Sequence, residues 1–180
     1  MIKVAIIGAG YMANEHIKAF SSLENVMVNG IFSRTKEKAI IISKKYKIEF
    51  VAESINELYN LTKADVVVNT SSVASILDTT KKCLNFPWIN LVEKPPGYNL
   101  NEALTLYELV EKKNAQLYVA LNRRHYSSVK KALFELKNDD SKRVVKVLDQ
   151  EDQNDPKRIG HSNKIIQNWM FANSIHLIDY

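Results

Sequence analysis

A glycine-rich turn near the start of the chain has the residue types and spacing of a phosphate-binding site. The segment Gly8-Ala9-Gly10-Tyr11-Met12-Ala13 reads G-x-G-x-x-A and directly follows the apolar run Ile2–Ile7. In such a turn the first glycine permits a tight bend, the second lets a pyrophosphate approach the backbone, and the alanine lets helix and strand pack closely. Its place between a strand and a helix favours this function over a turn that merely connects two elements. The predicted dinucleotide contacts are Gly8, Gly10, Tyr11, Met12 and Ala13.

Ser33 and Arg34 follow the next predicted strand, where a second contact to a dinucleotide is expected. A site that prefers NAD usually has Asp or Glu there, which bonds the ribose 2′-hydroxyl. Ser33 has no charge to repel a 2′-phosphate, and Arg34 can pair with that phosphate or stack on the adenine. The two residues therefore predict NADP as the preferred cofactor over NAD, unless Arg34 is a solvated loop residue.

A lysine and a histidine further along the chain have the chemistry to handle an alcohol. Lys94 stands in Glu93-Lys94-Pro95-Pro96 at a predicted strand end, and His176 lies in an apolar segment. Imidazole titrates near neutral pH and can take a hydroxyl proton, while an ammonium stabilises developing alkoxide charge. Two plainer alternatives remain open: the prolines may only stop the strand, and His176 may be a core histidine.

The remaining candidate side chains indicate no further site. His16, His125 and His161 lack the spacing of metal ligands and are interpreted as structural or surface residues, and no metal is expected. Cys83 is interpreted as a small buried hydrophobic residue on a helix.

Alternating strand and helix patterns precede residue 122 and must position these groups. Continuous apolar runs are typical of strands buried on both faces of a parallel sheet, so the pattern predicts an α/β, doubly wound sheet. Ser54 with Glu57 predicts a capping box, and Asn99 with Glu102 a similar helix start. The predicted strands are Ile2–Ile7, Val26–Phe32, Glu49–Ala52, Asp65–Thr70, Trp88–Glu93 and Gln116–Leu121. The predicted helices are Tyr11–Ser21, Lys36–Tyr46, Ile55–Asn60, Ala74–Asn85 and Leu100–Lys113, the last with Leu104, Leu106, Tyr107, Leu109 and Val110 facing a core.

The pattern changes after Leu121, which predicts one domain over 1–121 and part of a second over 122–180. Tyr126–Lys137 reads as an amphipathic helix and Val144–Leu148 as a strand. Glu151–Lys164 is polar and predicted to form a loop, and Ile165–Tyr180 is apolar and predicted to be helical near its end. A lone strand exposes its hydrogen-bonding edges, so this second part looks unfinished.

Composition limits the classes of partner. The 180 residues are 46% hydrophobic and 25% charged, with a single cysteine and a net charge of +5. The basic residues are spread along predicted helices, so we expect an anionic small molecule rather than nucleic acid as the partner. No apolar run is long enough to span a membrane, no signal peptide is visible, and a cytoplasmic location is expected.

Four motifs in this order resemble the glucose–fructose oxidoreductase / inositol dehydrogenase (Gfo/Idh/MocA) family. They are the glycine turn, Glu93-Lys94-Pro95, Asn122-Arg123-Arg124 and His176-Leu177-Ile178-Asp179. The resemblance implies a Rossmann-type sheet with NADP or NAD, followed by an α+β substrate domain. It implies hydride transfer between nicotinamide and a carbinol carbon of a sugar, nucleotide sugar or cyclitol. Lys94 would hydrogen-bond the reacting hydroxyl, His176 would accept its proton, and a cis-proline is expected at Pro95 or Pro96. Further cofactor contacts are assigned to Asn69, Thr70, Ser71, Glu93, Lys94 and Asn122.

The sequence also departs from the family pattern. Ala172 stands where many members carry a catalytic aspartate, and Thr70–Ser75 replaces a T-P-x-x-x-H pattern. Members usually continue for a large antiparallel sheet, so we expect a truncated chain, or one completed by a partner chain or as a homo-oligomer. Whether the chain is an enzyme thus stays open: a non-catalytic NADP-binding sensor or an inactive fragment is the alternative. Substrate identity, reaction direction and oligomeric state stay open too.

Overall fold

The computed structural model describes residues 1–137, 141–142, 144, 146–148, 150, 152 and 154–179. The chain divides into two compact units, Met1–Val119 and Ala120–Tyr180. Within the described residues, no helix is both long and apolar enough to cross a membrane.

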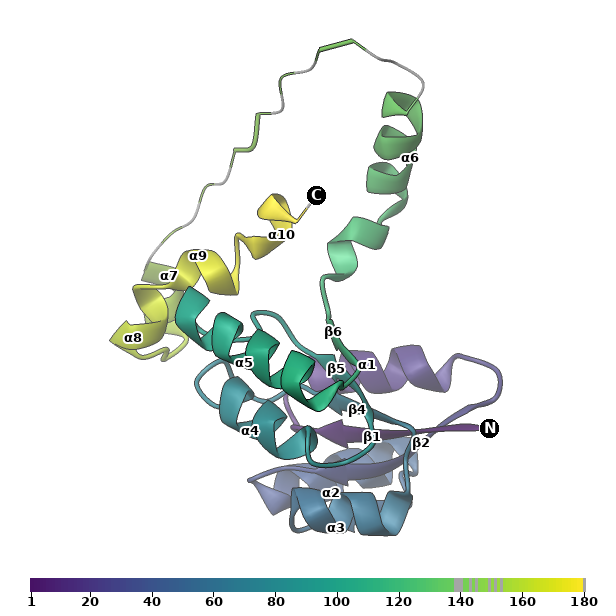
Figure 1. Cartoon of the computed structure of the whole chain (residues 1–180). Helices are drawn as coiled ribbons and strands as arrows, with labels where there is room; N and C mark the ends of the chain where they lie inside the picture. Colours follow the sequence, from purple (N-terminus) through teal and green to yellow (C-terminus); the bar gives the residue numbers. More distant parts are fainter. Residues whose placement is uncertain are drawn as a thin grey trace. The chain divides into compact units, whose positions relative to one another are not determined.

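Six strands and five helices alternate through the first unit (Figure 1). The strands are β1 (Ile2–Ile7), β2 (Val26–Phe32), β3 (Phe50–Ala52), β4 (Val66–Asn69), β5 (Ile89–Val92) and β6 (Leu117–Val119). The helices are α1 (Tyr11–Ser21), α2 (Lys36–Tyr46), α3 (Ile55–Thr62), α4 (Ile76–Cys83) and α5 (Leu100–Lys113).

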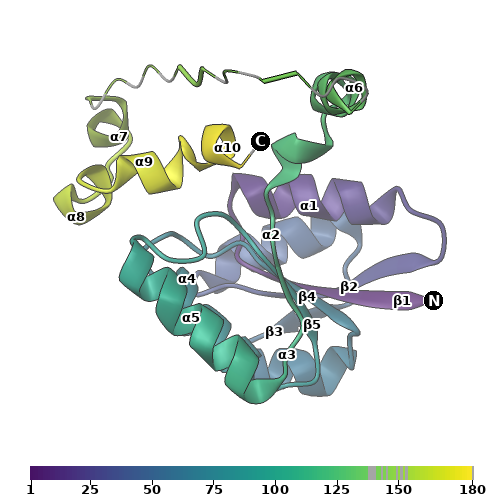
Figure 2. The same cartoon turned by 45° about the horizontal axis from the view of Figure 1, so that its top comes forward.

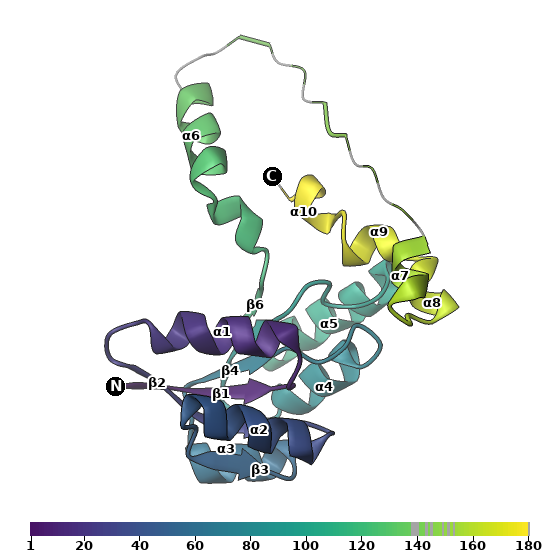
Figure 3. The ribbon, with the colours of Figure 1, turned by 180° about the vertical axis from the view of Figure 1, so that it is seen from behind.

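The strands form one parallel sheet in the order β3-β2-β1-β4-β5-β6. Side chains of β1 alternate between two apolar layers: Val4 and Ile6 pack with α1 and α2, whereas Ala5 and Ile7 pack with α3 and α4. Seen from behind, α1 runs beside β1 (Figure 3). Burial on both faces explains the continuous apolar runs, and the doubly wound fold predicted from them is confirmed.

All the predicted strands and helices of the first unit are present. Five of them have the predicted bounds, and the others differ by one or two residues at an end. For example, α3 continues to Thr62, two residues beyond the prediction, and ends where Lys63 adopts a left-handed conformation.

At the two predicted helix starts the capping side chain bonds the expected amide, but the glutamate bonds a different amide from the one predicted. The Ser54 hydroxyl accepts the Glu57 amide at 3.0 Å, and the Asn99 side chain accepts the Glu102 amide at 2.9 Å. However, Glu57 bonds the amide of Glu53 rather than that of the capping residue. Glu102 likewise bonds the amide one residue earlier, that of Tyr98. Each glutamate thereby fixes the residue that precedes the cap.

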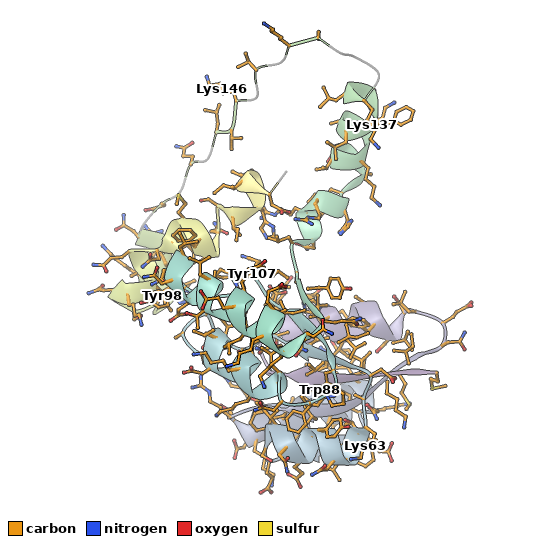
Figure 4. The ribbon with its side chains drawn as sticks, in the orientation of Figure 1. Lys63, Trp88, Tyr98, Tyr107, Lys137 and Lys146 are labelled. Carbon is orange, nitrogen blue, oxygen red and sulfur yellow. The ribbon has the colours of Figure 1, made fainter. Side chains whose placement is uncertain are left out.

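The apolar face predicted for α5 is too wide, because two of its five residues are exposed. Leu106 is buried, but Leu104 is 48% exposed and Tyr107 62% exposed. Figure 4 shows Tyr107 at the surface and Trp88, which is buried, within the unit. The reason is the position of α5, which lies beside α4 near the end of the sheet (Figure 2) and so buries one narrow stripe.

All the regular elements described in the second unit are helices or a 3₁₀ turn. It contains the 3₁₀ turn η1 (Asn122–His125), α6 (Ser127–Leu136), α7 (Asn154–Arg158), α8 (Asn163–Ile166), α9 (Trp169–Ala172) and α10 (Ile175–Ile178). The predicted helix near Tyr126–Lys137 is confirmed as α6, and α9 and α10 confirm helix near the end of the chain.

Two predictions for this unit are wrong. Val144, Lys146, Val147 and Leu148 are not in a strand, and Val145 lies outside the described residues. A strand needs a neighbour to receive its hydrogen bonds, and none of the described residues there supplies one. The polar stretch Glu151–Lys164, predicted to be a loop, contains α7 and the start of α8.

Candidate functional site at the carboxyl edge of the sheet

A cavity of about 360 Å³ opens at the carboxyl ends of β1, β2 and β4. The strand order changes direction between β1 and β4, and open α/β sheets bind ligands at such a point. The lining residues are Ile7, Gly8, Ala9, Gly10, Phe32, Ser33, Arg34, Thr35, Lys38, Thr70, Ser71, Ser72, Ser75 and Thr79. The cavity thus brings together six predicted contacts: Gly8, Gly10, Ser33, Arg34, Thr70 and Ser71.

Glycine stands at the two positions of the turn for different physical reasons. Gly8 has φ +107°, and a Cβ there would lie 2.9 Å from the Thr70 carbonyl oxygen. Gly10 has ordinary extended φ, and a Cβ there would meet no protein atom within 4 Å. Gly8 is therefore required by the fold, whereas the space before Gly10 is left open at the start of α1.

Hydrogen bonds to neighbouring strands fix this turn. The Gly8 amide donates to the Phe32 carbonyl at 2.8 Å, which ties the turn to β2. The amide and hydroxyl of Thr70 both donate to the Ile7 carbonyl at 2.8 Å, which ties it to β4. The glycine turn is thus held in shape by the sheet itself.

Asn69 supports the loop that follows β4. Its side chain is buried, accepts the Ser71 amide at 3.0 Å and donates to the Thr80 hydroxyl at 2.9 Å. The Ser71 hydroxyl is buried against the cavity and, among the described residues, has no hydrogen-bond partner. A ligand hydroxyl or amide would satisfy that atom.

Two cations lie on the β2 side of the cavity. Arg34 and Lys38 are exposed, and within the part of the chain that the structure describes neither forms an ion pair. The Ser33 hydroxyl accepts the Thr35 amide at 3.3 Å and so shapes the bend that carries them. The place of Lys38 at the cavity was not predicted from the sequence, because it depends on α2 beginning at the same edge of the sheet as the glycine turn.

A second cavity of about 700 Å³ adjoins the first and shares Phe32, Arg34 and Thr79 with it. Its one carboxylate, Glu53, pairs with Lys36 at 2.5 Å. That lysine lowers the pKa of the Glu53 carboxyl. The negative charge is therefore balanced locally, and Arg34 stays available to an anion between the two cavities.

Six of the predicted contacts in the first unit do not line the main cavity. They are Tyr11, Met12, Ala13, Asn69, Glu93 and Lys94. Ala13 is fully buried on the core-facing side of α1, as expected of a residue that allows close packing, and Tyr11 is 76% exposed. Lys94 follows β5, and the expected cis-proline is present as the Lys94–Pro95 peptide bond.

Glu93 has protein partners for both carboxylate oxygens. Its Oε1 lies 2.7 Å from Nε2 of His16, on α1, and its Oε2 accepts the Lys94 amide at 3.2 Å. No sequence pattern indicates the contact with His16, because the two residues are 77 positions apart and His16 lacks the spacing of a metal ligand.

The second unit holds the other predicted residues, Asn122 in η1 and His176 in α10. His176 is buried, and so is Ala172. In this unit the Arg124 guanidinium forms two hydrogen bonds with the Asp179 carboxylate, which joins η1 to the end of α10. Arg124 lowers the pKa of the Asp179 carboxyl, although burial acts in the opposite direction. Two motifs 55 residues apart are thus connected.

The residues at the edge fit a dinucleotide. The open space before Gly10 would receive the pyrophosphate, Arg34 and Lys38 supply positive charge, and Ser71 has an unsatisfied hydroxyl. Phosphate groups bind well at helix amides and beside guanidinium groups.

Comparisons with known proteins agree with this fold. Residues 2–121 match the GFO_IDH_MocA family, described as an oxidoreductase family with an NAD-binding Rossmann fold.

Several solved structures share the fold. A Gfo/Idh/MocA family oxidoreductase from Vibrio cholerae is 22% identical, with a TM-score of 0.68, 77% of this chain covered and 44% of that one. The scyllo-inositol dehydrogenase of Lactobacillus casei, solved with NAD(H) and scyllo-inositol, is 18% identical, with a TM-score of 0.70 and coverages of 77% and 41%. A dehydrogenase from Chromobacterium violaceum is 20% identical, with a TM-score of 0.69 and coverages of 78% and 41%.

The chain thus spans less than half the length of these proteins. At such identities the structural likeness carries the fold alone, whereas the family match covers most of the chain. The glycine turn, the strand order and that match lead to one conclusion: the chain belongs to the Gfo/Idh/MocA oxidoreductase family and contains its NAD(P)-binding Rossmann domain.

Proposed function

We propose that the chain binds NADP(H) in preference to NAD(H), as the cofactor domain of an oxidoreductase. The observation that carries this proposal is the pair of exposed cations, Arg34 and Lys38, beside the open space at Gly10. The 2′-phosphate distinguishes NADP from NAD, and a bidentate guanidinium with a nearby ammonium suits a dianion. Because Ser33 stands where a carboxylate would select the 2′-hydroxyl, nothing at that position repels the phosphate.

The proposed reaction is hydride transfer between the nicotinamide and a carbinol carbon. The nicotinamide, when bound, supplies the hydride chemistry. Lys94 Nζ would donate a hydrogen bond to the reacting oxygen and stabilise its developing negative charge. His176 would take the hydroxyl proton during oxidation and return it during reduction. Tyr11, Met12, Asn69, Glu93 and Asn122 keep their proposed place around the cofactor.

The proposed substrate is a sugar, nucleotide sugar or cyclitol. The Lactobacillus casei relative was solved with scyllo-inositol, a cyclitol, which supports this class. We propose that residues 122–180 begin a substrate domain, which would be completed by a partner chain or in a homo-oligomer. Ala172 instead favours a second function, NADP binding without turnover, because alanine cannot assist proton transfer as an aspartate would.

Titration with NADPH and NADH tests the cofactor preference. We expect NADPH to bind more tightly, and Arg34→Ala or Lys38→Ala to weaken NADPH binding roughly tenfold while changing NADH binding little, since each removes a charge-assisted bond to the 2′-phosphate. Lys44→Ala is the matched control, because Lys44 is exposed on the same helix and does not line the cavity. Tighter binding of NADH, or equal losses for both cofactors, would contradict the preference.

Turnover tests the reaction. The chain is assayed with NADP⁺ and a panel of sugars and cyclitols, by absorbance of the reduced nicotinamide. A substrate-dependent signal that is lost in Lys94→Ala and in His176→Ala supports hydride transfer. Cofactor binding without turnover on any of them favours the non-catalytic function.

A further inference from the structure

We infer that His16, on the phosphate-binding helix, is a positioning residue for Lys94 and acts through the buried carboxylate of Glu93. The inference rests on the proposed function, because that proposal makes Lys94 the catalytic lysine. Its structural basis is the contact between His16 Nε2 and Glu93 Oε1 at 2.7 Å, together with the bond from the Lys94 amide to Glu93 Oε2 at 3.2 Å.

Glu93 is held from three sides. Its residue exposure is 7%, so its carboxylate needs partners inside the protein. The backbone amide of Glu93 donates to the Asn69 carbonyl at 2.9 Å, which extends the pairing of β5 with β4 by one residue. With His16 on one oxygen and Lys94 on the other, the carboxylate would have to give up both bonds to turn toward a ligand. We therefore assign Glu93 a supporting role in the cofactor site.

His16 links this carboxylate to the helix that begins at Gly10. An ionised carboxylate can only accept, and imidazole Nε2 can donate to it, so the two side chains are complementary at this distance. The ring is half-buried and stacks on Phe20, one turn further along α1, with 6.5 Å between ring centroids. The helix that would receive the pyrophosphate and the backbone of the proposed catalytic lysine are thus connected through one side chain.

Two substitutions at position 16 separate a positioning role from mere packing. The amide nitrogen of glutamine reaches about as far from the backbone as imidazole Nε2, whereas that of asparagine corresponds to Nδ1 and falls short. We expect His16→Gln to keep the bond to Glu93 and His16→Asn to lose it. Lys18→Ala is the matched control, since it breaks an exposed 2.7 Å ion pair with Glu15 on the same helix.

The first readout is the Lys94 amide resonance in ¹⁵N-labelled protein without cofactor. We expect this resonance to shift in His16→Asn and in Glu93→Gln, and to stay near its original position in His16→Gln and Lys18→Ala. An unshifted Lys94 amide in His16→Asn would overturn the inference, whatever the change in stability. If His16→Asn does not fold, His16→Ala against His16→Gln gives the same comparison.

The second readout is affinity for NADPH, with the unsubstituted chain as reference. We expect His16→Asn to weaken binding roughly tenfold and His16→Gln to restore it, because a buried acceptor is left unsatisfied only in the first. Equal affinities in these two variants would count against the inference. If the unsubstituted chain binds neither NADPH nor NADH, the proposed function fails, while the Lys94 resonance still decides the link from His16 to Lys94.

Discussion

At the scale of single residues, the site depends on where a side chain is absent as much as on where one is present. Gly8 is fixed by a backbone conformation that side chains rarely adopt and by the nearby Thr70 carbonyl. Gly10 faces open space instead. The motif G-x-G-x-x-A thus contains one glycine that the fold requires and one that leaves open space, and that space is where we propose that a ligand binds.

The two glycines should separate stability from binding. Gly8→Ala is expected to lower the free energy of unfolding by roughly 1–3 kcal/mol, because it places a Cβ at positive φ against a carbonyl. Gly10→Ala is expected to change stability by less than about 0.5 kcal/mol and to weaken NADPH binding at least about tenfold, since its methyl group fills the pyrophosphate position. Urea unfolding and calorimetric titration measure the two effects. The reverse pattern would contradict these roles.

Cys83 offers a second test at this scale. It is fully buried, and burial raises the pKa of its thiol from 9.0 to about 12. The thiolate is the reactive form, so a thiol reagent at pH 8 should react slowly with the folded chain and quickly after unfolding in urea. This agrees with Cys83 as a small buried hydrophobic residue. Rapid labelling of the folded chain would show that α4 does not protect it.

At the scale of elements, the strands of the sheet could be predicted well from the sequence because each strand is a local apolar run. Val4–Ile7 and Val66–Val68 are recognisable without knowledge of their neighbours. Contacts between elements that lie far apart in the sequence could not be predicted in this way. His16 meets Glu93 across 77 residues and Arg124 meets Asp179 across 55, and no local pattern signals either pair. The apolar face of α5 was predicted too wide for the same reason, because the burial of this helix depends on where the sheet ends.

The pair Arg124 and Asp179 predicts a pH dependence in the second unit. Arg124 holds the pKa of Asp179 below its ordinary value of 3.8. The pair should therefore stabilise the end of α10 at pH values above 3.8, and its contribution should be lost as the pH falls through the lowered folded-state pKa. Amide exchange at residues 175–179 should be faster in Arg124→Ala than in the unsubstituted chain at pH 7, with the difference gone well below pH 3.8.

Arg123→Ala is the matched control for this prediction. Arg123 precedes Arg124 in η1 and, within the described residues, forms no ion pair. It should leave exchange near α10 unchanged at every pH. A difference between Arg124→Ala and the unsubstituted chain that persists at low pH would mean that packing, not charge, joins η1 to α10.

At the scale of the whole molecule, the topology of the sheet brings the residues of the candidate site together. Parallel strands deliver the glycine turn, the bend at Ser33–Arg34 and the loop at Thr70–Ser71 to one edge, where the order turns from β1 to β4. This edge could be predicted from the sequence because a βαβ pattern fixes which strand ends meet. The second unit could be predicted less well, since short helices such as α7 lie in polar sequence with little apolar periodicity.

The most direct test is to map NADP⁺ binding on the ¹⁵N-labelled chain by amide chemical shifts. We expect the largest shifts at Gly8, Ala9, Gly10, Arg34, Lys38 and Ser71, which line the cavity at the carboxyl edge. The exposed face of α5, away from that cavity, should stay unchanged. Shifts confined to α5 or to the second unit, with the glycine turn unaffected, would contradict the site described for this domain.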